Sequence, residues 1–124
     1  MSYLVVFAGG GLGAALRHLV NILGARWLGS GFNYATLLEN VSGSCVMGML
    51  VAYFAFKGGV PQHYRLFLTT GILGGYTTFS AFSLDTVLLY ERGEPWLAAL
   101  YAALSVGLSV SGLIGGLALV RHFT

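Results

Sequence analysis

The sequence contains very little charge for its length. Of its 124 residues, six are Lys or Arg and four are Asp or Glu, together 8% of the chain, whereas a soluble domain carries about 25%. Hydrophobic residues make up 56%, and the mean hydropathy is +0.80. Because so few charged side chains cannot cover a soluble globule, the composition indicates an integral membrane protein. The net charge of +2 is also too small to favour nucleic-acid binding.

Groups that carry out chemistry are scarce as well. The one cysteine, Cys45, permits no disulfide within the chain and is interpreted as a packing residue. The three histidines, His18, His63 and His122, lie on separate segments, which argues against a histidine metal site. Since there is no carboxylate pair or nucleophile–base arrangement, nothing favours an enzyme. The first positive side chain is Arg17, so we expect no cleaved signal peptide.

Long apolar segments, in contrast, are abundant. A helix needs roughly 20 residues to cross a bilayer, and four segments are long enough, separated by short connectors that contain charge, glycine or proline. We therefore expect an all-α integral membrane protein, with residues 1–124 forming a single four-helix transmembrane domain. The expected spans are approximately Tyr3–Leu23, Thr36–Phe56, Tyr64–Tyr90 and Pro95–Val120.

The positive side chains are divided evenly between the two sides of the membrane. Such a balance gives the positive-inside rule almost nothing to act on. Two interpretations stay open: subtler features set one orientation, or the chain inserts both ways and pairs with an inverted copy. The expected sides collect Lys57, Arg65 and Arg121 on one face and Arg17, Arg26 and Arg92 on or near the other.

Small and polar residues recur at helical spacing within the spans. Several of the 19 glycines lie four apart, which lets membrane helices approach closely and predicts a compact bundle or a tight dimer. Two stripes of polar residues, also four apart, are predicted to lie each on one helix face. They could join helices or line a path, and the pattern leaves both open. The stripes are Thr36, Asn40 and Ser44 in the second span and Tyr101, Ser105 and Ser109 in the fourth.

The stretch GGYTTFSAFS, residues 74–83, interrupts the third span with five hydroxyls. Its double glycine makes a helix break inexpensive, and the hydroxyls that follow can satisfy the backbone groups released there. Broken membrane helices expose carbonyls that can coordinate a cation. Phe79 and Phe82 share a helix face, and their positive ring edges would tolerate an anion; plain packing is the alternative. With Arg17 able to attract anions from within the first span, this donor-rich lining favours anion transport.

The sequence resembles the Fluc (CrcB-like) fluoride channels of bacterial inner membranes over essentially its whole length. The resemblance is carried by GGGLGAALRH in the first span, TLLENVSGS in the second, GILGGYTTFSAFS in the third and the Tyr101, Ser105 and Ser109 ladder in the fourth. It implies an antiparallel, dual-topology homodimer that lets fluoride leave the cell passively and so confers fluoride resistance. The third helix is expected to be broken mid-membrane.

The resemblance also implies roles for individual residues. Phe79 and Phe82 match the rings that face fluoride, Asn40 matches the pore asparagine, and Arg17 matches an arginine near the aqueous vestibule. The backbone carbonyls of Gly74 and Thr77, from both subunits, match the positions that hold a structural sodium ion at the dimer centre. The residues that match the polar track are Thr36, Tyr101, Ser105 and Ser109.

Two acidic residues depart from the family pattern. Glu39 stands where an apolar or small residue is expected, and an anion there would oppose fluoride unless it faces away, is protonated or is paired. Asp85 stands where a longer acid is usual. Two other functional classes remain as alternatives. A small dual-topology multidrug exporter would use an acid in the first span, where this chain has Arg17; a structural membrane subunit would use the polar residues only as contacts between helices.

Overall fold

The computed structural model describes residues 1–29 and 32–124. Four helical segments in this part of the chain are long and apolar enough to cross a membrane, as predicted. The middle of the first connector, residues 30–31, lies outside the described residues. The spans are α1 (Ser2–Leu28), α2 (Tyr34–Lys57), the segment Gln62–Glu91 and α6 (Pro95–Phe123).

The helices extend beyond their predicted limits because local capping moves their ends. Helix α2 begins at Tyr34 because the Asn33 side chain caps it, with Asn33 Oδ1 accepting a hydrogen bond of 3.2 Å from the Thr36 backbone N–H. Helix α1 continues to Leu28 and ends at Gly29, whose φ of 82° is readily adopted by glycine. Pro95 occupies the first turn of α6, as expected.

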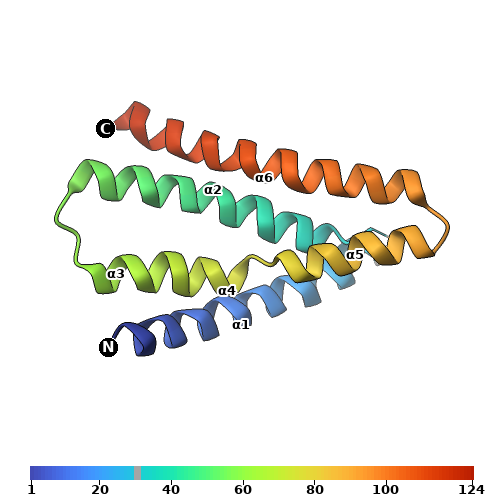
Figure 1. Cartoon of the computed structure of the whole chain (residues 1–124), viewed down its shortest axis with the longest axis horizontal. Helices are drawn as coiled ribbons and strands as arrows, with labels where there is room; N and C mark the ends of the chain where they lie inside the picture. Colours follow the sequence, from blue (N-terminus) through green and yellow to red (C-terminus); the bar gives the residue numbers. More distant parts are fainter. Residues whose placement is uncertain (30–31) are drawn as a thin grey trace.

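The third span consists of several elements in succession. They are α3 (Gln62–Leu66), the π-helical segment η1 (Phe67–Leu73), α4 (Gly74–Tyr76) and α5 (Phe79–Glu91). Between α4 and α5, Thr77 (φ −85°, ψ 153°) and Thr78 (φ −151°, ψ 124°) are extended. Figure 1 shows this non-helical connection near the middle of the molecule. We call Thr77 and Thr78 the interruption.

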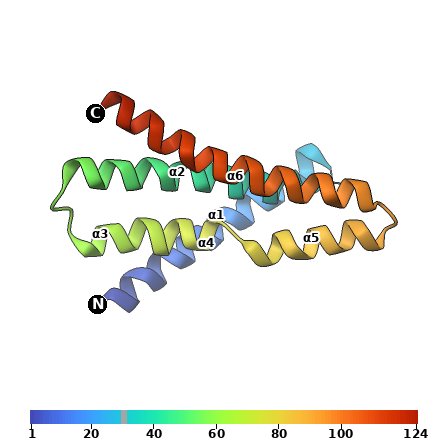
Figure 2. The same cartoon turned by 45° about the horizontal axis from the view of Figure 1, so that its top comes forward.

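The spans pack as two pairs: α2 with α6, and α1 with the third span. Helices α2 and α6 lie side by side and run in the same direction, while α1 crosses the third span (Figures 1 and 2). Close approach requires glycine in both pairs. A Cβ on Gly9 would lie 2.6 Å from the Phe67 carbonyl oxygen, and one on Gly116 would collide with the Cys45 carbonyl oxygen. The glycine pattern thus predicted close helix packing correctly.

Candidate ion pathway beside the interruption

The interruption is held by an amide side chain from a neighbouring helix. Asn40 on α2 donates from Nδ2 to the Thr78 carbonyl oxygen at 3.1 Å, and its Oδ1 accepts from the Thr78 backbone N–H at 2.8 Å. One side chain therefore satisfies both backbone groups of an extended residue inside a membrane span, where an unpaired group would be costly. This pair of bonds is called the Asn40 clamp below.

The threonine hydroxyls complete the interruption, as the sequence suggested. Thr78 Oγ1 accepts from the Ala81 backbone N–H at 3.2 Å and so caps the start of α5. Thr77 Oγ1 donates to the Leu73 carbonyl oxygen at 2.8 Å, at the end of the preceding helical segment. The hydroxyls therefore bond mainly to their own span, while the extended backbone of Thr78 is paired by α2.

Arg17 lies against the segment just before the interruption. Its Nε donates to the Gly75 carbonyl oxygen at 3.1 Å, and the side chain is half-buried. The arginine of α1 thus binds a main-chain oxygen of α4 near Gly74 and Thr77. No local sequence pattern predicts this contact, because it joins residues 58 positions apart.

A cluster of three aromatic side chains, Phe79, Phe82 and Tyr101, begins immediately after the interruption. The Phe79 and Phe82 ring centroids are 5.4 Å apart, and Phe82 stacks on Tyr101 of α6 at 5.8 Å. The Phe79 side chain is 76% exposed on the single chain, whereas Tyr101 is fully buried. The prediction that the two phenylalanines share one face is therefore confirmed. Whether their edges face fluoride stays a prediction.

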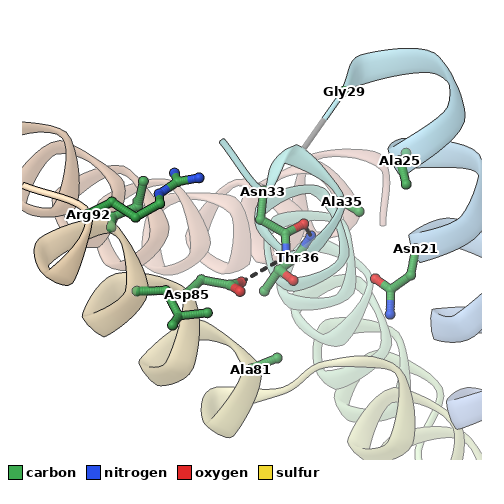
Figure 3. Close-up of a pocket in the computed structure, with 12 residues that line it drawn as sticks. Asn21, Ala25, Gly29, Asn33, Ala35, Thr36, Ala81, Asp85 and Arg92 are labelled. Carbon is green, nitrogen blue, oxygen red and sulfur yellow. Dashed lines mark hydrogen bonds between the residues drawn. The ribbon is translucent and has the colours of Figure 1, made fainter. Parts of the chain in front are cut away.

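A hydrogen-bonded network connects α5, α6 and the start of α2. Tyr101 Oη donates to Asp85 Oδ2 at 2.9 Å, and Asn33 Nδ2 donates to the same oxygen at 3.0 Å. Figure 3 shows Asn33 and Asp85 directed toward each other. Sequence reasoning had not selected Asn33. Its position just before an apolar span is a helix-capping signal that could have identified it.

The rest of the predicted polar track is buried, and part of it has no partner. Thr36 and Ser105 are buried, and Ser109 is half-buried. Within residues 1–29 and 32–124, the hydroxyl oxygens of Ser105 and Ser109 have no hydrogen-bond partner, nor do the carboxyl oxygens of Glu39. Buried polar groups are normally paired, so these two serines on α6 are available to a ligand or to water.

A cavity of about 400 Å³ lies between α1, α2 and α5. Its lining brings polar side chains from the three helices together, as Figure 3 shows. Its polar residues include Asn21, Asn33, Thr36, Asp85 and Arg92. The cavity reaches Thr36, the first member of the predicted polar track, and could therefore admit water or an ion to that end of the track.

A metal ion would need main-chain ligands. In the described part of the chain, no group of three or more His, Cys, Asp or Glu side chains could hold one. Carbonyl oxygens at the end of a broken helix are the usual substitutes in membrane proteins. Gly74 is exposed and Thr77 is extended and half-buried, and backbone carbonyl oxygens such as theirs are the type of ligand that a hard cation accepts.

Comparison with known proteins agrees with the resemblance described above. The family model described as CrcB-like protein, Camphor Resistance (CrcB), matches residues 4–117. The chain is 64% identical over 124 residues to the fluoride-specific ion channel FluC of Rhodopseudomonas palustris (strain BisB5), with both proteins covered completely. It is also 64% identical, again over both full lengths, to fluoride-specific ion channel FluC 2 of Nitrobacter hamburgensis. Four membrane-spanning helices and a family match along nearly the whole sequence place this chain in the CrcB-like family.

Proposed function

We propose that this chain is a fluoride-selective channel of the bacterial inner membrane that allows passive fluoride export and so confers fluoride resistance. The observation that carries the proposal is the Asn40 clamp with the exposed Phe79 ring beside it. That arrangement occurs in a chain 64% identical, end to end, to proteins named fluoride-specific ion channels.

The pathway follows the rings and the α6 hydroxyls. Fluoride is small and strongly hydrated, so fixed donors must replace its water. Phe79 and Phe82 offer positive ring edges, and Ser105 and Ser109 offer hydroxyls that bond to nothing else in the described chain. Larger halides fit a site of this kind poorly, which gives selectivity. Thr36, Asn40 and Tyr101 line the same track.

The functional unit is an antiparallel homodimer of dual topology. Phe79 and Gly74 are exposed on the single chain, right beside an interrupted backbone. Irregular backbone is tolerated at membrane depth only where protein buries it or water reaches it, so a second copy covers this face. The even division of positive charge supports opposite orientations of the two copies.

A sodium ion would join the two broken third spans at the dimer centre. The backbone carbonyls of Gly74 and Thr77 from both subunits would hold it. When bound, the cation supplies positive charge that stabilises a nearby anion and fixes the two interruptions relative to each other. Arg17, which bonds to the Gly75 carbonyl oxygen, adds a second positive charge on the vestibule side.

Fluoride efflux from proteoliposomes, compared with chloride efflux, tests the proposal. We expect fast fluoride release without a proton gradient, and at least a tenfold reduction in Asn40→Asp, because a carboxylate repels both fluoride and the Thr78 carbonyl oxygen. Equal chloride leakage would contradict the selectivity. Dependence on a proton gradient would indicate an exporter, and unchanged release in Phe79→Ile and Phe82→Ile would indicate that the rings only contribute to packing.

A further inference from the structure

Glu39 is a buried acidic residue that neither the fold nor the proposed pathway uses. Its side chain is fully buried. Neither carboxyl oxygen has a hydrogen-bond partner in the described chain. An ionised carboxylate without partners is very costly to bury, whereas the neutral acid is far less so. Burial without partners therefore favours the protonated, neutral form of this carboxyl.

The neighbours of Glu39 one helical turn away show which face of α2 it occupies. Ala35 packs against α1, because a Cβ on Gly24 would lie 2.7 Å from the Ala35 Cβ. Gly43 packs against α4, because its own Cβ would lie 3.2 Å from Tyr76 Cδ2. Residues four apart share a face, so Glu39 is directed into the bundle between α1 and α4. Asn40 is turned from it by about 100°.

Pairing does not account for Glu39. The charged groups that act on it electrostatically are Arg17 from α1 and Asp85 from α5. Arg17 uses its Nε for the Gly75 carbonyl oxygen, and neither Glu39 oxygen accepts a hydrogen bond from any described residue. The other titratable groups nearby are Tyr76 of α4, beside Gly43, and Tyr101 of α6. Neither offers a compensating positive charge.

We propose that Glu39 is a proton-binding site inside the membrane and that loss of its proton suppresses fluoride conduction. The inference rests on the proposed function. With the proton bound, Glu39 is neutral and adds no negative charge to the pathway beside Asn40. With the proton released, a negative charge in a medium of low dielectric repels an anion moving past the interruption.

The cavity between α1, α2 and α5 comes within one helical turn of Glu39, which is not itself among the lining residues. Its lining includes Ala35 and Thr36, which precede Glu39 by one turn of α2, and Asn21 and Gly24 from the facing side of α1. Figure 3 shows Asn21 and Thr36 bordering the same space. Water that enters this cavity would lie within one helical turn of the Glu39 carboxyl, close to where its proton must leave and return.

Fluoride efflux measured over a pH series, with equal pH on both sides of the proteoliposome membrane and a constant fluoride ion concentration, tests the inference. We expect the wild-type rate to fall about tenfold or more as the pH is raised. Glu39→Gln, which imitates the neutral acid, should keep the low-pH rate throughout. Glu91→Gln, which changes an exposed acid at the end of α5, is the matched control and should follow the wild type.

Two outcomes would overturn the inference. One is a wild-type rate that does not change with pH, and the other is a Glu39→Gln rate that falls in parallel with the wild type. If Glu39→Gln does not fold, Glu39→Met provides the uncharged variant, with the same expectation. The absence of selective fluoride flux from the wild type at every pH would instead contradict the proposed function, so the two failures are distinguishable.

Discussion

The polar groups of the interruption are hydrogen-bonded within the chain, whereas the hydroxyls of Ser105 and Ser109 on α6 are not bonded to any described residue. At the interruption, the Thr78 backbone and the Thr77 and Thr78 hydroxyls all have partners within the chain. On α6, the buried hydroxyl oxygens of Ser105 and Ser109 have none among the described residues. The first set maintains a backbone geometry, while the second is free to bind something else. Substitutions in the two regions should therefore affect stability and transport differently.

The largest loss of stability is expected when the Asn40 clamp is removed. Asn40→Ala leaves the Thr78 N–H and C=O groups without their partners inside a membrane span. The free energy of unfolding should fall by about 2–4 kcal/mol, since each unsatisfied buried group costs about 1–3 kcal/mol. Chemical unfolding in detergent measures it. A stability equal to that of the wild type would mean that water replaces the clamp.

A smaller loss of stability is expected when the Tyr101–Asp85 hydrogen bond is removed. Tyr101→Phe keeps the ring that stacks on Phe82 but removes the Oη donor. Because Asn33 still donates to the same Asp85 oxygen, the free energy of unfolding should fall by only about 1.5–2 kcal/mol, near the lower limit for a bond to a charged group. Asn33→Ala provides the comparison: because each donor compensates for the loss of the other at Asp85 Oδ2, the double variant should lose more stability than the sum of the two single variants.

The free energy of unfolding is expected to fall by about 1 kcal/mol when the cap of α5 is removed, as is typical of N-cap substitutions. Thr78→Ala removes the hydroxyl that accepts from the Ala81 N–H. Thr78→Ser retains the hydroxyl and should restore most of the stability. If serine is as destabilising as alanine, the methyl group rather than the cap is responsible. Unfolding of the three proteins under identical conditions distinguishes these outcomes.

The smallest change in stability, with a large change in transport, is expected on α6. Ser109→Ala removes a hydroxyl that bonds to no described residue, so the free energy of unfolding should stay within about 0.5 kcal/mol. Fluoride efflux should fall about tenfold, the equivalent of losing one hydrogen bond to an ion. Ser111→Ala, at an exposed position on the same helix, should change neither quantity. A destabilised Ser109→Ala variant with normal efflux would contradict the comparison.

Much of the fold follows from local patterns in the sequence. Apolar length predicted the four spans, glycine spacing predicted close helix contacts, and the three-residue spacing of Phe79 and Phe82 placed their rings on one face. These features depend on composition and on the helical period alone. The predicted helix ends were less accurate: the Asn33 cap makes α2 begin at Tyr34 rather than at the predicted Thr36.

The cross-helix contacts of the site did not follow from such patterns. Asn40 and Thr78 are 38 positions apart, and Arg17 and Gly75 are 58 apart. No local periodicity encodes which backbone group a polar side chain will meet after helices pack. The burial of Glu39 is of the same kind, since it depends on how α1 and α4 lie against α2.

The contact between α2 and α6 limits how this protein can change through evolution. A methyl group at Gly48 would meet the Leu113 carbonyl oxygen, and one at Gly116 would meet that of Cys45. Both obstacles are main-chain atoms, so a second substitution that shortens a side chain cannot remove them. We therefore expect genetic suppressors of Gly48→Ala or Gly116→Ala to be almost unobtainable, although neither glycine lies among the residues assigned to ion conduction.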